Sequence, residues 1–131
     1  MSLPRTLFIG KGDGAVTWYR CALPATVHGC DWIGLKGEPE AHAITTGEVP
    51  SEFTLADAAT YDVVVVQQVA GPAWLRQIRE WQDAGVTVLY EVDDWLHGVR
   101  RVRHHALAEK FDRATVETYE LCMRAADGII C

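Results

Sequence analysis

The sequence predicts a three-layer α/β domain built on a parallel sheet of about five strands. Three runs of apolar, mostly β-branched residues, at 6–10, 62–68 and 86–92, lead directly into polar or glycine-rich turns. Strands that are apolar on both faces belong in the middle of a parallel sheet covered by helices. Segments with helical periodicity alternate with these runs, and this alternation is typical of parallel βαβ units.

The amino-terminal part of the chain is expected to form a strand, a helix and a second strand. After the strand at 6–10 comes the loop GKGDGAV, and a helix is expected over about 17–27 with Thr17 as its cap. Pro24 lies inside this helix and should kink or shorten it, because proline has no backbone N–H. The second strand is predicted at 31–35, where the sequence is DWIGL.

The segment 37–60 is rich in Gly, Pro, Ser and Thr and has little periodicity. It is expected to be a long excursion, with room for a short strand at 43–45 and a helical turn near 54–59. The third strand follows at 62–68, with the sequence DVVVVQQ.

The carboxyl-terminal half contains the clearest helix signal. Pro72 suits a first helical position and Gly85 suits the residue just after a helix. One face of this helix is apolar and consists of Trp74, Leu75, Ile78 and Trp81. The fourth strand is expected at 86–92, and a long helix is expected at about 104–125.

The last segment, 127–131, begins a fifth strand, and the predicted strand order is 3-2-1-4-5. The chain is expected to form one domain over 1–131, and a doubly wound domain would continue with a covering helix. A longer natural protein is therefore expected. If the chain stops at Cys131, the uncovered Ile129 and Ile130 predict a homodimer.

Composition limits the class of protein. With 131 residues, of which 49% are hydrophobic and 23% charged, the chain is the size of one globular domain. The net charge of −6 argues against a general nucleic-acid surface, and no apolar run is long enough for a membrane span. The four cysteines lack zinc-like spacing and are expected to be buried thiols in a reducing cytoplasm: Cys21, Cys30, Cys122 and Cys131.

Three turns are predicted to meet at one edge of the sheet, because the carboxyl ends of parallel strands lie together. They contain the glycine loop around Gly12, Asp13 and Gly14, the pair Gln67–Gln68, and the pair Asp93–Asp94. Backbone N–H groups of the glycine loop are suited to a phosphate or a sugar. A purely structural tight turn is the alternative, since the spacing GxGxG is not the dinucleotide fingerprint.

The carboxylates of Asp93 and Asp94 are candidates for accepting sugar hydroxyls, for acting as a base or for helping to hold a cation. Neighbours on an extended segment face opposite ways, so one of the two is expected to have a structural role. A metal site is not predicted, because the pair and His97 lack a recognised ligand spacing. Arg100, in the basic run RRVRHH, is a candidate phosphate ligand, with a solvated surface as the alternative.

Four segments carry a family resemblance: GKGDGAVTWYRCALPA, YDVVVVQQ, WQDAGVTVLYEVDDWLHGVR and LCMRAADGIIC. Together they resemble the N-terminal, Rossmann-like half of GT-B glycosyltransferases, especially the glycosyltransferase family 1-like proteins of bacteria and phages. The most specific parts are the helix that carries Tyr19, Arg20 and Pro24, the acidic end of the fourth strand, and the ADGII strand.

The resemblance implies transfer of a sugar from a nucleotide-sugar donor to an acceptor, without a metal or a tightly bound cofactor. In such enzymes the N-terminal domain holds mostly the acceptor, and the glycine loop approaches the donor diphosphate or the acceptor. Asp93 and Asp94 match the acidic strand end of the family. The C-terminal domain is missing from this chain, so the chain alone is expected to be inactive.

Two other functions are compatible with the residues. A stand-alone nucleotide-binding domain would hold NADP, with Lys36 on the 2′-phosphate. A non-enzymatic module would associate through the face beside Cys131 and bind nothing in the crevice.

Overall fold

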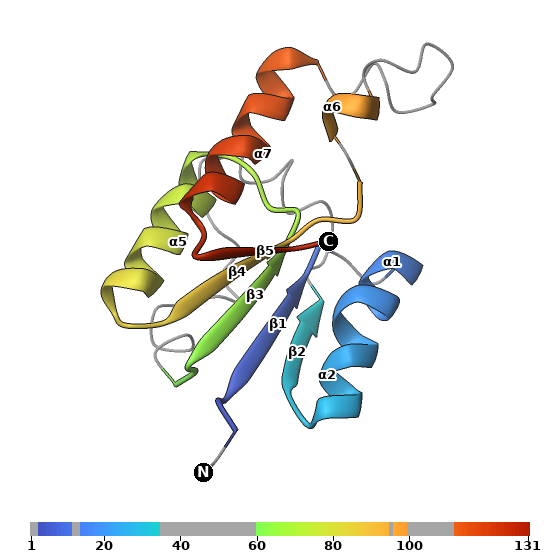
Figure 1. The fold of residues 1–131 in the computed structure, drawn as a ribbon, viewed down its shortest axis with the longest axis vertical. Helices are drawn as coiled ribbons and strands as arrows, with labels where there is room; N and C mark the ends of the chain where they lie inside the picture. The colour runs from blue at the N-terminus through green and yellow to red at the C-terminus, as the bar shows by residue number, and fades with distance from the viewer. Residues whose placement is uncertain (1–2, 12–13, 35–59, 95, 100–111) are drawn as a thin grey trace.

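The fold is an α/β domain with helices on both sides of one parallel sheet (Figure 1). The computed structural model describes residues 3–11, 14–34, 60–94, 96–99 and 112–131. The five strands of the sheet are β1 (Thr6–Gly10), β2 (Asp31–Gly34), β3 (Val63–Gln67), β4 (Thr87–Glu91) and β5 (Gly128–Ile130). The helical segments are α1 (Ala15–Thr17), the π-helical turn η1 (Trp18–Ala22), α2 (Leu23–His28), α5 (Pro72–Asp83), α6 (Leu96–Val99) and α7 (Arg113–Ala125).

The predicted fold class is confirmed, and every described strand pair is parallel. The strand order is β2-β1-β3-β4-β5, so β3 lies between β1 and β4. The expected order 3-2-1-4-5 placed this third strand beyond the second and therefore needs correction at that position. Burial gives the reason: Val64 to Gln67 are all buried, as in a central strand, whereas Asp31 and Trp32 of β2 are exposed, as at an edge.

This correction moves the point where the strand order reverses. In the described sheet β2 and β3 lie on opposite sides of β1, so the reversal occurs between β1 and β3. Ligands of open α/β sheets bind at the carboxyl ends of the strands on either side of such a reversal. The neighbour of the end of β1 at this edge is therefore Gln67–Gln68 rather than Asp93–Asp94.

The core lies mainly between the sheet and the helices α5 and α7. Alternate strand residues such as Leu7, Val64 and Val88 pack there against Trp74 and Trp81 of α5. These two indoles are completely buried, and their ring centroids are 6.4 Å apart. In Figure 1, α5 and α7 cover one side of the sheet, and α1 and α2 cover the other. The apolar face predicted for the α5 helix is thus confirmed.

The first helix differs in detail from the prediction. It begins at Ala15 with Gly14 as its cap, so the predicted cap at Thr17 is wrong. Thr17 is buried instead and donates its hydroxyl to the side chain of Gln67. The kink expected at Pro24 takes the form of a π-helical turn, in which the Leu23 N–H donates to the Trp18 carbonyl just before the proline.

Several predicted features lie outside the described residues. These are the strand at 43–45, the turn near 54–59, the start of the helix at 104–111, and the individual residues Gly12, Asp13, Lys36 and Arg100. The last helix, α7, begins at Arg113, because Asp112 has an extended backbone and its carboxylate caps the helix by accepting a hydrogen bond from the Thr115 N–H at 2.7 Å. The prediction of one continuous helix over about 104–125 is therefore wrong at Asp112. In the part of the chain that the structure describes, none of the helices combines the length and apolarity needed to cross a membrane.

Candidate functional site

Polar side chains converge where β1, β3 and β4 end, and we call them the β1–β3 cluster. Its members are Lys11, Thr17, Arg20, Gln67, Gln68 and Glu91. They come from four elements and are linked by hydrogen bonds rather than by sequence proximity. The prediction that the described ends of these strands share one edge is confirmed by the parallel pairing of β1, β3 and β4.

Gln67 anchors the cluster to β1 and to the first helix. Its side chain is fully buried, and its Oε1 accepts hydrogen bonds from the Lys11 N–H at 3.1 Å and from Thr17 Oγ1 at 2.9 Å. Thr17 can reach this oxygen because β1 ends in Gly10, where a Cβ atom would lie only 2.1 Å from Thr17 Cγ2. The glycine therefore lets the helix approach the strand closely enough for the contact.

Gln68 has a backbone conformation that residues with a side chain rarely adopt, with φ at 45°. Its N–H donates to the Glu91 carbonyl at 2.9 Å, which ties the end of β3 to the end of β4. Its side-chain Oε1 accepts a hydrogen bond from the Lys11 ammonium. Its Nε2 is buried and has no hydrogen-bond partner among the described residues, although buried amides are nearly always paired.

Glu91 is the buried carboxylate of the cluster, with 2% of its side chain exposed. Arg20 donates from Nε to one carboxylate oxygen and from Nη2 to the Val92 carbonyl at 3.2 Å. The other oxygen, Oε2, has no hydrogen-bond partner within the described chain. Burial raises the pKa of Glu91, although the Arg20 guanidinium opposes this shift, and the charge of Asp93 adds to it.

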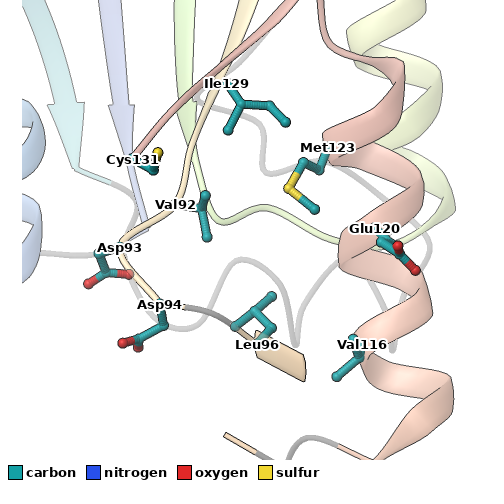
Figure 2. A pocket seen from close by; sticks show the side chains of 9 residues that line it. All are labelled: Val92, Asp93, Asp94, Leu96, Val116, Glu120, Met123, Ile129 and Cys131. Carbon is teal, nitrogen blue, oxygen red and sulfur yellow. The ribbon is translucent and has the colours of Figure 1, made fainter. Parts of the chain in front are cut away.

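Asp93 and Asp94 are exposed and lie apart from these hydrogen bonds. They form one end of a cavity, which we call the β4–β5 pocket, bounded by the segment after β4, α6, α7 and the end of the chain. Figure 2 shows the two aspartates on the side of this pocket opposite α7. The structure therefore separates the two groups of predicted residues into neighbouring parts of one sheet edge.

The other predicted site residues have distinct positions. Tyr19 lies in the π-helical turn, and its side chain is 66% exposed, beside the half-buried Arg20. Gly14 is exposed at the start of α1. Gly12, Asp13 and Arg100 lie outside the described residues.

Lys11, Thr17 and Glu91 belong to the site, although the sequence alone did not predict them as site residues. The signal for Glu91 was available, because a charged residue directly after the buried Tyr90, within an apolar strand, points to the opposite face of the sheet. Its partner Arg20 is 71 residues away in the chain, so only the fold reveals the pair.

The described residues contain no group of three or more His, Cys, Asp or Glu side chains arranged to hold a metal ion. Comparisons of the chain with protein-family models, with curated proteins and with solved structures give no match. Evidence for function therefore comes from the site itself and from the resemblance of the sequence.

Proposed function

We propose that the chain is the acceptor-side half of a glycosyltransferase, and that the β1–β3 cluster contacts the nucleotide-sugar donor. The observation that carries the proposal is a group of buried polar atoms in this cluster without hydrogen-bond partners in the described residues, namely Gln67 Nε2, Gln68 Nε2 and Glu91 Oε2. The two amide nitrogens are donors and the carboxylate oxygen is an acceptor, and all lie at the reversal between β1 and β3 or beside it. A ligand rich in hydroxyl and phosphoryl groups supplies both kinds of partner.

The charges of the cluster suit such a ligand. The Lys11 ammonium makes its side-chain hydrogen bond to the neutral amide of Gln68, so its charge is not neutralised there. A phosphate oxygen is a stronger acceptor for this ammonium than an amide oxygen. Displacement of the Gln68 amide by a diphosphate would also free Gln68 to bond a sugar hydroxyl.

Exposed aromatic rings in the same helical turn as Arg20 support the same ligand class. Trp18 and Tyr19, both in η1, are 51% and 66% exposed. Exposed aromatic faces of this kind stack on the apolar faces of sugars and on bases. The strain at Gln68 also fits a ligand site, because non-glycine residues at positive φ cluster at functional positions.

The main alternative is a nucleotide-binding domain without transfer activity. The described strand order supports it, because doubly wound domains with this order hold a mononucleotide at the reversal between the first and third strands. The two functions differ in the ligand that the β1–β3 cluster prefers.

The test is a titration of the isotope-labelled chain, followed by NMR, with UDP-glucose, GDP-mannose, FMN and NADPH. The proposal expects a nucleotide sugar to shift the amide signals of Lys11 and Gln68, and Lys11→Met to weaken its binding by about tenfold. Arg124→Met, at an exposed surface position of α7, is the matched control and should bind normally. Preference for FMN or NADPH, or the absence of nucleotide-sugar binding, would reject the proposal.

A further inference from the structure

The β4–β5 pocket is a cavity of about 300 Å³, and Figure 2 shows the side chains that line it. Its walls are mostly apolar and are formed by Val92, Leu96, Val116, Met123 and Ile129. Leu96 and Val116 are buried, so this part of the wall is fixed by packing and is not a mobile surface patch. The volume is at the lower end of the range of about 300–1,000 Å³ that is usual for small-molecule sites.

Among the described residues that line the cavity, the charged side chains all have one sign. Asp93 and Asp94 form one end, and Glu120 of α7 lies on the opposite side. Glu120 is paired with Arg124 at 3.0 Å, whereas Asp93 and Asp94 form no ion pair with another described residue. None of the described residues that line the cavity is Lys or Arg.

We propose that the β4–β5 pocket binds a small apolar molecule that carries an amine. The apolar part of the molecule would pack against the walls formed by Leu96, Val116 and Met123, because this contact removes its apolar surface from water. The ammonium group would lie at the open end beside Asp93 and Asp94, where opposite charges attract it without being deeply buried. This inference rests on the proposed function in one respect only, in that it makes the amine the acceptor of the sugar. In that transfer the ammonium passes a proton to Asp93 or Asp94, and the freed nitrogen lone pair forms a bond to the anomeric carbon of the sugar. The bond from that carbon to the donor phosphate breaks, and the nucleoside diphosphate leaves with the bonding electrons.

The signs of the charges also separate this ligand from the donor. A nucleotide sugar carries phosphate charges, which Asp93 and Asp94 repel and Lys11 attracts. The donor therefore belongs at the β1–β3 cluster and the amine at the β4–β5 pocket. The two sites are connected through the short segment that joins Glu91 to Asp93.

The test uses three probes that share one naphthalene ring and differ in charge: 1-naphthylmethylamine, 1-naphthylmethanol and 1-naphthoate. Calorimetry at pH 7 should give the tightest binding for the amine, about tenfold tighter than for the neutral alcohol, and the weakest for the anion. The preference for the amine should shrink at 1 M salt, because salt screens exposed charges. Equal affinity for all three probes, or a preference for the anion, would overturn the proposal.

Variants of the chain test whether the amine binds in this pocket. Met123→Trp fills the cavity and should weaken binding of the amine by at least about tenfold, while Leu121→Trp, on the exposed face of the same helix, is the matched control. The double variant D93N/D94N should abolish the preference for the amine over the alcohol. Should Met123→Trp fail to fold, methyl NMR of the unchanged chain answers the same question.

The methyl NMR experiment expects the amine to shift the signals of Leu96, Val116 and Met123. Shifts confined to other methyl groups would overturn the assignment of the pocket. The result is independent of the donor titration described above. Amine binding without nucleotide-sugar binding would reject the glycosyltransferase proposal alone, whereas nucleotide-sugar binding without amine binding would reject the pocket proposal alone.

Discussion

The β1–β3 cluster and the β4–β5 pocket lie at the same edge of one sheet, yet they are built in opposite ways. In the cluster the polar groups are buried and bonded to one another, as Glu91 is to Arg20 and Gln67 to Thr17. In the pocket the apolar groups are buried, and the charged groups Asp93 and Asp94 are exposed. Only one residue, Val92, lies between Glu91 and Asp93 in the chain.

The difference shows which carboxylate depends on the fold. Glu91 has been removed from water and relies on Arg20, because an uncompensated buried charge is costly. Asp93 and Asp94 remain in water and need no partner. Changes in the cluster should therefore affect stability as well as binding, whereas changes at the pocket aspartates should affect binding alone.

The largest effect on stability is expected from Gly10→Ala. The new methyl group would lie 2.1 Å from Thr17 Cγ2, so the first helix must move away from β1 and break the Thr17–Gln67 hydrogen bond. Overpacking of this kind costs about 2–3 kcal/mol of unfolding free energy. Gly14→Ala is the control, since nothing lies within 4 Å of its added methyl group. Urea unfolding measures both, and equal stabilities would contradict the close approach.

The next effect is expected from Arg20→Met, which leaves the Glu91 carboxylate buried without its cation. Because the Arg20 side chain is 33% exposed, water can replace part of the lost interaction. A loss of about 2 kcal/mol is expected, below the range for a fully buried pair. Asp94→Asn, at the pocket, should change stability by no more than about 0.5 kcal/mol. If the two variants unfold at the same urea concentration, the comparison between the two regions fails.

A smaller effect concerns pH. The pKa of Glu91 is raised above its ordinary value of 4.5, so the folded chain holds this proton more tightly than the unfolded chain does. The contribution of Glu91 to stability is therefore fully present below pH 4.5 and decreases as the pH rises toward the raised pKa. The measurement is the difference in unfolding free energy between the unchanged chain and Glu91→Gln across pH 4 to 8. If the unfolding free energies of the two chains changed in parallel with pH, burial would not shift the pKa of this carboxyl group.

The smallest perturbation is thiol labelling, which needs no substitution. Cys21 lies next to Arg20 and is fully buried, and burial raises its pKa to about 12. Cys131 lines the β4–β5 pocket and is exposed. Iodoacetamide at pH 8 should therefore label Cys131 in the folded chain and Cys21 only after unfolding. Mass spectrometry of digested samples measures the labelling of both cysteines. Labelling of Cys21 before the chain unfolds would show that the cluster opens readily.

The sequence by itself determined the parallel α/β class and most of the strands. The apolar runs at Val63–Gln67 and Thr87–Glu91 are buried or partly buried at every residue except Thr87, as a run of apolar β-branched residues predicts for central strands. The helix Pro72–Asp83 was equally predictable, because its proline and its apolar face are local signals.

Only the tertiary structure decided which residues meet. The position of β3 beside β1, and with it the reversal point, depends on how the connections cross the sheet, which no local pattern specifies. The contact between Arg20 and Glu91 depends on the π-helical turn and on the close approach of the helix at Gly10. The pair Asp93–Asp94 was conspicuous in the sequence because it is charged. Glu91 was less conspicuous, as a single charge within an apolar strand. Successive side chains of a strand face opposite sides of the sheet, and the sequence alone does not reveal which helix covers the side that Glu91 faces.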